Sequence, residues 1–259
     1  MLKRKKIFLF SLLGLSIFFM SCVNGVKTSV DITKDWKLSL QDKMDFASPN
    51  FDDSSWESRA SISSVNFGTV GEHYYWIRKT IPIPKSLQND NIYLGFDRGN
   101  YAVDVYAGGT YIGSRGSLPP NYNMRIENSL DILIPQNCIN NNEVTLALRV
   151  YTLETDINNM NLYLDSPAQA FFQNKIHNIF TQRMFLLMAV ICLFMLVYSI
   201  GQFSSTKEMS YLFYAISLGF IAYYFYDMGC EVPFIYYPLH RAVSRVSLII
   251  SMSFMGLFL

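Results

Sequence analysis

The chain has 259 residues, enough for one or two domains. Charged residues make up only 16% of it and aromatic residues 15%, a composition that argues against a wholly soluble protein and against a disordered one. A net charge of +1 offers no basic field, so we expect no nucleic-acid partner. Residues 184–259 hold only six of the charged side chains. Two different kinds of chain are therefore expected to join near residue 180.

Residues 1–22 are predicted to form a signal peptide. Residues 3–6 are all basic, and an uncharged apolar run follows from Ile7 to Met20, which is short for a membrane span but typical of an export signal. Ser21 and Cys22 come next, and this pair resembles the lipid-attachment site of bacterial lipoproteins. Two interpretations stay open: lipidation at Cys22, or an export signal in which Cys22 has no role. Both place the following residues outside the cytoplasm.

Residues 26–165 are predicted to form an all-β domain, a jelly-roll sandwich. From Val144 to Val150 apolar residues alternate with others, which puts four apolar side chains on one face of a strand. Ile92–Phe96 is a second apolar run that follows turn-forming residues. Gly108 and Gly109 separate two further runs, and paired glycines tolerate the positive φ angles of a tight hairpin.

Five short segments of this domain form a pattern: Trp36–Leu38, Asp52–Trp56, Tyr75–Lys79, Val105–Gly113 and Asn142–Val150. In the same order, they resemble segments of the N-terminal sugar-binding-type jelly roll of the β-galactosidase and β-glucuronidase family of glycoside hydrolases. The resemblance implies a galactose-binding-like sandwich and a carbohydrate ligand. It does not imply catalysis, because the catalytic carboxylates of that family lie in a separate barrel domain. We therefore expect neither enzyme activity nor a cofactor from this chain.

Polar residues on predicted loops are the candidates for ligand contact. They are Arg98, Asn100, Arg115 and Asn121. The three tryptophans allow two interpretations, since each could stack on a sugar ring or fill the sandwich core. The three histidines are far apart in the sequence, so we expect no metal site.

Residues 166–183 are predicted to link the sandwich to membrane-spanning helices in residues 184–259. Residues 184–206 and 209–226 are uncharged and long enough to cross a bilayer, and the two-residue loop between them requires an antiparallel hairpin. A third apolar helix is expected over 242–259. At 1.5 Å per residue its uncharged part would be too short to span, so we expect this span to be incomplete and the chain to be a fragment.

Residues 198–215 of the first two spans resemble bacterial seven-transmembrane receptors with diverse intracellular signalling modules. The matching residues are Tyr198 to Phe203 and Lys207 to Ala215, although Ser199 stands where that family has Asn. The resemblance implies a receptor in the bacterial cytoplasmic membrane that passes a signal to a cytoplasmic module. The export signal places the β domain outside the cell and the Lys207 loop inside, although the positions of Arg241 and Arg245 oppose this orientation.

Two functions from different classes follow from the sequence. The favoured one is a receptor whose exported sandwich senses a ligand, such as a carbohydrate, and relays the signal through the bilayer. The alternative is a membrane-anchored carbohydrate-binding accessory domain of a glycoside hydrolase. A structural envelope protein without a ligand is a third possibility.

Overall fold

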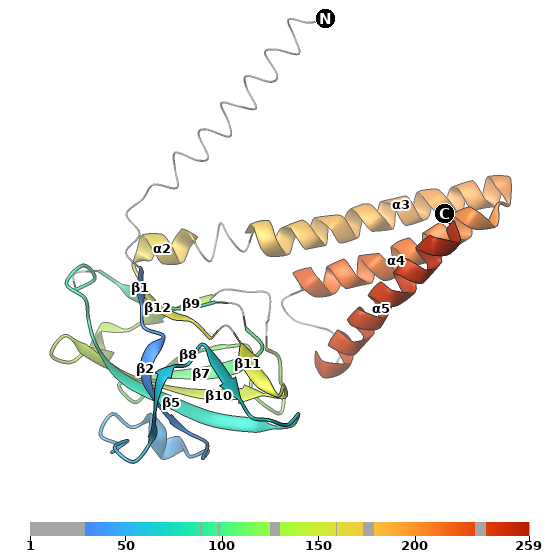
Figure 1. The fold of residues 1–259 in the computed structure, drawn as a ribbon. Helices are drawn as coiled ribbons and strands as arrows, with labels where there is room; N and C mark the ends of the chain where they lie inside the picture. The colour runs from blue at the N-terminus through green and yellow to red at the C-terminus, as the bar shows by residue number, and fades with distance from the viewer. Residues whose placement is uncertain are drawn as a thin grey trace, which may run out of the picture.

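The computed structural model describes residues 29–258, apart from residues 89, 98, 125–129, 159, 173–178 and 231–236. The predicted signal peptide with Cys22, and the candidate residue Arg98, lie outside the described residues. Within them, a β-sandwich is followed by three long helices (Figure 1). The predicted fold class, an all-β jelly-roll sandwich followed by apolar helices, is therefore confirmed.

Two antiparallel sheets make up the sandwich. The four-stranded sheet has the order β1-β12-β6-β9 and the six-stranded sheet the order β3-β2-β5-β10-β7-β8, while β4 and β11 form a separate pair. The strands are β1 (Ser29–Asp31), β2 (Lys34–Ser39), β3 (Glu57–Ser61), β4 (Ser64–Asn66), β5 (His73–Pro82), β6 (Ile92–Phe96), β7 (Ala102–Ala107), β8 (Thr110–Arg115), β9 (Leu130–Ile134), β10 (Glu143–Thr152), β11 (Asp156–Asn158) and β12 (Leu162–Asp165).

The core lies between the two sheets and follows from the alternation in the sequence. Val144, Leu146, Leu148 and Val150 of β10 are fully buried, and they share one apolar cluster with the buried residues of β6 in the opposite sheet. β10 pairs with β5 over ten residues and with β7 on its other side. This central position explains why its apolar pattern is the clearest in the chain.

The predicted hairpin joins β7 to β8. Gly108 and Gly109 have φ angles of +54° and +85°, which a side-chain-bearing residue adopts only with strain. Two short 3₁₀ turns, η1 (Met44–Ala47) and η2 (Gln136–Cys138), lie in the loops of the sandwich.

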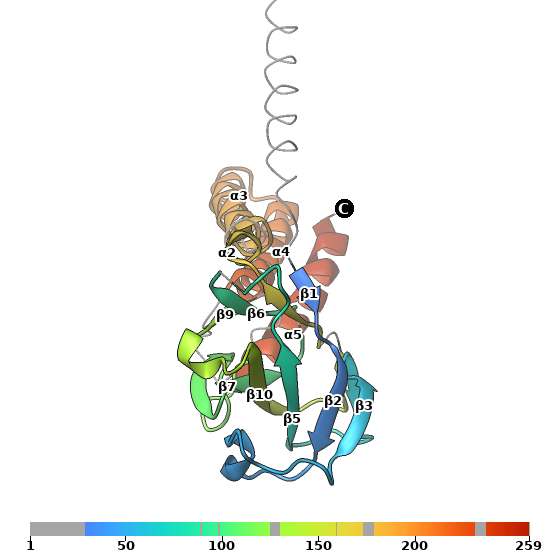
Figure 2. The same ribbon diagram turned by 90° about the vertical axis from the view of Figure 1, so that its left-hand side faces the viewer.

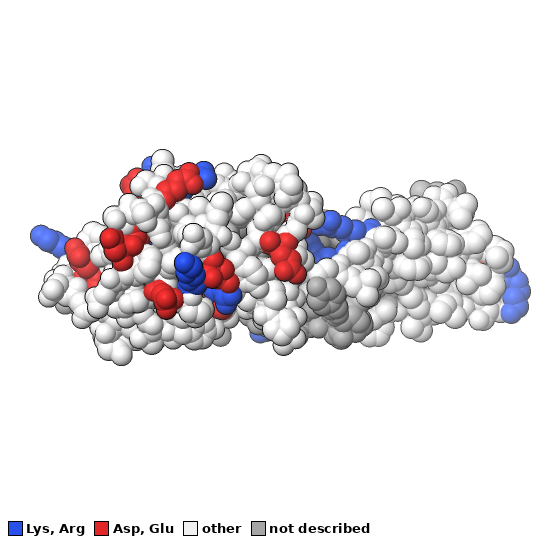
Figure 3. All heavy atoms as spheres, turned by 90° about the horizontal axis from the view of Figure 1, so that it is seen from below, with Lys and Arg blue, Asp and Glu red and all other residues white. Residues whose placement is uncertain are grey.

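In the described part of the chain, five helical segments follow β12. They are α2 (Pro167–Phe171), the π-helical turn η4 (Ile179–Arg183), α3 (Met184–Thr206), α4 (Met209–Gly229) and α5 (Tyr237–Phe258). By length and composition, α3, α4 and α5 are each able to cross a membrane. Figure 3 shows charged side chains scattered over the sandwich, whereas the helical part of that face is uncharged except near its ends.

The helices differ from the prediction at two places. α3 occupies the residues predicted for the first span, but α4 continues to Gly229. α5 begins at Tyr237, five residues before the predicted position, and its 22 residues include Arg241. This charge is accommodated because Arg241 Nη1 lies 2.8 Å from Asp227 Oδ2 on α4.

Candidate ligand-binding hollow and membrane junction

The loop between β2 and β3 carries a polar hollow on the sandwich. This loop, blue in Figures 1 and 2, lies at the end of the sandwich far from α3, α4 and α5. The hollow has a volume of about 370 Å³, and its polar lining consists of Ser39, Gln41, Lys43, Asp45, Ser55 and Glu57. We call it the distal hollow.

Arg78 on β5 fixes the shape of this loop. Its guanidinium is buried and donates to Asp53 Oδ2 at 3.0 Å, to the carbonyl of Phe46 at 3.0 Å and to that of Pro49 at 2.8 Å. Lys37 Nζ lies 2.6 Å from the other oxygen of Asp53. One buried cation therefore holds three points of the loop. It also explains why the segments Tyr75–Lys79 and Asp52–Trp56, which are far apart in the sequence, lie together.

Asp42 ties the loop to the sheet at a second place. Both of its carboxylate oxygens accept from the Arg149 guanidinium, at 2.8 and 2.6 Å, and the Trp76 indole N–H donates to it at 2.9 Å. Burial raises the pKa of the Asp42 carboxyl, but these hydrogen bonds outweigh burial and hold the pKa below its ordinary value. The ionised carboxylate is therefore part of the folded loop.

Aromatic rings form one wall of the distal hollow. Trp56 is half-buried there, and its ring packs edge-on against Phe46 with centroids 4.8 Å apart and lies 5.7 Å from Phe51. Trp36 and Trp76, in contrast, are fully buried. Trp36 belongs to the core between the two sheets, whereas Trp76 lies in a separate apolar cluster with Phe46 of the loop between β2 and β3. Of the two interpretations of the tryptophans, filling of the sandwich core therefore holds for Trp36, and Trp56 borders a hollow.

The predicted ligand-contact residues that the structure describes lie elsewhere. Asn100 ties its loop to β11, because its amide donates to the carbonyl of Asp156 at 2.7 Å and accepts from the N–H of Asn158 at 3.0 Å. Asn121 is exposed. Arg98 lies outside the described residues. Neither Asn100 nor Asn121 lines the distal hollow.

Arg115 is fully buried at the end of β8. Its guanidinium donates to the carbonyls of Tyr101, Met124 and Gly99 at 2.7, 3.1 and 3.1 Å, and it lies over the Tyr101 ring. It holds two loops together from inside the domain. Its contact with a ligand stays a prediction.

The same loops meet α5. Tyr122 packs edge-on against Tyr151 of β10, with centroids 4.8 Å apart, and against Tyr237 of α5, with centroids 5.8 Å apart. All three side chains are buried in one apolar cluster. We call this contact the membrane junction, because it joins the sandwich to the first residue of an apolar helix.

A buried polar cluster lies one helical turn beyond the membrane junction. His240 Nε2 lies 2.8 Å from Asp227 Oδ1, Arg241 Nη1 lies 2.8 Å from the other oxygen, and Tyr223 Oη lies 2.9 Å from His240 Nδ1. The side chains of His240 and Asp227 are only 2% and 3% exposed. Paired ionisable residues inside apolar helices are costly, and they commonly mark functional positions.

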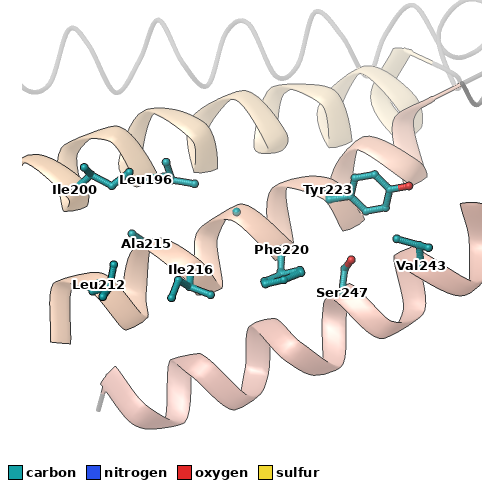
Figure 4. A pocket seen from close by; sticks show the side chains of 10 residues that line it. Leu196, Ile200, Leu212, Ala215, Ile216, Phe220, Tyr223, Val243 and Ser247 are labelled. Atoms are coloured by element: carbon teal, nitrogen blue, oxygen red, sulfur yellow. The ribbon is translucent and has the colours of Figure 1, made fainter. Parts of the chain in front are cut away.

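The three helices also enclose an apolar groove of about 530 Å³ (Figure 4). Leu196 and Ile200 come from α3, most of the remaining lining comes from α4, and Val243 and Ser247 come from α5. Nearby, the Ser217 hydroxyl lies 3.0 Å from that of Ser251, so the seam between α4 and α5 is polar.

Comparisons with known proteins concern the sandwich. No family model matches the chain, and no curated protein matches it. Among solved structures, β-glucuronidase 2 of Bacteroides uniformis is similar, with 17% identity and a TM-score of 0.44 over 54% of this chain and 18% of that one. A glycosyl hydrolase family 2 member from Bacteroides cellulosilyticus gives 14% identity and a TM-score of 0.43 over 53% of this chain and 20% of that one. The chain thus covers about a fifth of each enzyme, and their activity is not transferred to it.

Proposed function

We propose that this chain is a membrane-anchored binding protein whose sandwich takes a carbohydrate in the distal hollow. One observation supports the ligand class: an indole, two phenyl rings and a leucine line one small hollow together with carboxylate, amide, ammonium and hydroxyl groups. Aromatic faces pack against the C–H groups of sugars, while hydrogen-bond donors and acceptors of the lining pair with the sugar hydroxyls. The hollow lies on the loop that Arg78 and Asp42 fix in place, so it is formed before a ligand arrives.

Titration of the full chain in detergent with a panel of oligosaccharides tests this proposal. Trp56→Ala is expected to weaken binding of any oligosaccharide by about tenfold or more, because the ring would lose its contact area. Tyr111→Ala is the matched control, since Tyr111 is an exposed aromatic residue of β8 that does not line the hollow. Absence of binding across the panel, or equal binding by Trp56→Ala, would refute the proposal.

The orientation and the membrane are part of the proposal. The export signal predicted in residues 1–22 favours a sandwich outside the bacterial cytoplasmic membrane, with the turn between α3 and α4 inside. Lipidation of Cys22 would add a second anchor to the apolar helices. Protease added to intact spheroplasts should remove the sandwich, and a sandwich that is cleaved only after lysis would contradict this orientation.

Signalling is a second candidate function, favoured by the membrane junction. A receptor needs two states that differ in ligand affinity, and a physical contact through which the ligand site and the membrane helices influence each other. Tyr237 supports this role by joining the sandwich, although not the distal hollow itself, to the helices, because it packs on Tyr122 while His240, one turn later on α5, pairs with Asp227 of α4. The output would pass to a cytoplasmic signalling module. An accessory domain of a glycoside hydrolase would need the helices only as an anchor.

Ligand affinity in a junction variant separates the two functions. By linkage, a receptor with Tyr237→Ala should bind the oligosaccharide with an affinity changed by about fivefold or more, although Tyr237 does not line the distal hollow. Leu239→Ala is the control, because Leu239 is an exposed residue of the same helix turn. Unchanged affinity in Tyr237→Ala would favour the anchored accessory domain.

A further inference from the structure

Two carboxyl groups meet on the outer face of the four-stranded sheet. Asp131 of β9 lies directly opposite Gly95 of β6, and Asp165 ends β12 on the other side of β6. A side chain at Gly95 would collide with both: its Cβ would lie 2.7 Å from Asp131 Oδ1 and still closer to Asp165 Oδ2. The glycine therefore leaves the space in which the two carboxyl groups converge.

The pair is withdrawn from water. Asp165 is 2% exposed and Asp131 is half-buried, and no ion pair among the described residues includes either one. One oxygen of each, Asp131 Oδ2 and Asp165 Oδ1, is buried without a hydrogen-bond partner. Two ionised carboxylates that converge on one point beside Gly95 would repel each other strongly.

Among the described residues, no cation relieves this repulsion. The charge of Asp97, after β6, raises the pKa of Asp165 further, while a hydrogen bond with Ser29 of β1 lowers it but does not outweigh burial. Asp31 on β1 and Tyr163 on β12 are further titratable groups on the strands packed against the pair, and neither is cationic. The helix α2, which packs on β6 and β12, consists of Pro, Ala, Gln, Ala and Phe and has no charge. A proton between the two carboxyl groups removes the repulsion and lets one donate to the other.

We infer that Asp131 and Asp165 form a site for one shared proton, and that loss of this proton above neutral pH loosens the sheet where the chain enters α2. Asp165 directly precedes Ser166, the residue that caps α2 by accepting from the N–H of Gln169. Protonation therefore acts at the start of the segment that leads to α3. This inference concerns a different site from the distal hollow and stands without the proposed ligand.

The pH range follows from the direction of the shifts. Burial, and then the charge of Asp165, raise the pKa of Asp131 to about 8, and burial also raises the pKa of Asp165. The unfolded chain releases this proton near pH 4, so the folded state holds a proton that the unfolded state lacks between about pH 4 and pH 8. The stabilisation is complete below that range and is lost as the pH rises through it. The unfolding equilibrium constant should rise by up to about tenfold per pH unit.

Denaturant unfolding of the full chain in detergent, from pH 5 to pH 9, tests the inference. All three tryptophans lie in the sandwich, so their fluorescence reports its unfolding. Asp131→Asn keeps an N–H donor for Asp165 but does not titrate, so its stability should vary less with pH than that of the natural chain and exceed it at pH 8. Asp90→Asn, an exposed control, should keep the natural pH dependence.

Two results would overturn the inference. One is a pH dependence that is parallel in the natural chain and in Asp131→Asn, which would place the titrating group elsewhere. The other is a rise in stability of the natural chain on adding calcium at pH 8 that Asp131→Asn lacks, because the pair would then bind a cation instead of a proton. The shared proton would be supported if Asp131→Asn is more stable than the natural chain at pH 8 and calcium changes the stability of neither.

Discussion

Replacing Arg78 by methionine should both destabilise the sandwich and dismantle the distal hollow. Arg78 is 3% exposed, and its loss would remove one of the two cations that bind Asp53 and leave the carbonyls of Phe46 and Pro49 without this donor. Breaking one partner of a buried charged pair costs about 3–5 kcal/mol, and methionine replaces most of the apolar stem. Lys37 still reaches Asp53, which favours the lower end of this range.

Urea unfolding followed by tryptophan fluorescence measures this cost. With a urea dependence of about 1–3 kcal/mol per molar, the midpoint should fall by roughly 1–3 M. Lys79→Met is the matched control, because Lys79 is the next residue of β5 and its ammonium donates only to the carbonyl of Lys34 at an exposed position. If Arg78→Met costs no more than Lys79→Met, the role given to Arg78 in building the loop is wrong.

Two further predictions concern loops of the sandwich. Asp42→Asn should cost about 1–2 kcal/mol at pH 7, because the bidentate contact with Arg149 needs the ionised carboxylate. Since folding lowers the pKa of Asp42, the cost should vanish as the pH falls below about 4, and a pH-independent difference in unfolding free energy would contradict this. Gly116→Ala should destabilise more than Gly68→Ala. Both glycines have positive φ angles, +74° at Gly116 and +77° at Gly68. Only at Gly116 would the new methyl group collide with a backbone carbonyl, that of Asn123. Equal melting temperatures of the two variants would refute this reasoning.

The strands and apolar helices could be predicted because local patterns determine them. Ile92–Phe96 forms β6 with the predicted bounds, and the alternation in β10 reflects burial of one face against the opposite sheet. α3 is almost uniformly apolar, so its composition alone indicates a helix able to span a bilayer. The sequence predicts the start of α5 five residues too late. The predicted span begins directly after Arg241, and the sequence does not show that Arg241 pairs with Asp227, 14 residues earlier, and can therefore lie inside the helix.

The candidate site could not be predicted because contacts between distant residues create it. Arg78 and Asp53 are 25 residues apart, and only their pairing turns the loop between β2 and β3 into a lined hollow. The sequence predicts Arg115 on a loop, as a candidate for ligand contact, since arginine is rarely buried, yet three carbonyls and an aromatic ring surround its guanidinium inside the domain. The signal present in the sequence was Trp56, which lies among polar residues after the turn at Asp52 and Asp53.

A double-mutant cycle between Tyr122 and Tyr237 measures the contact between the sandwich and the membrane helices most directly. Replacing each ring by leucine, singly and together, and following sandwich unfolding in the full chain should give a coupling free energy of about 0.5–1.5 kcal/mol. The same cycle between Tyr111 and Tyr237 should give none, because Tyr111 is exposed on β8. A coupling of zero between Tyr122 and Tyr237 would mean that the sandwich is only tethered to the helices.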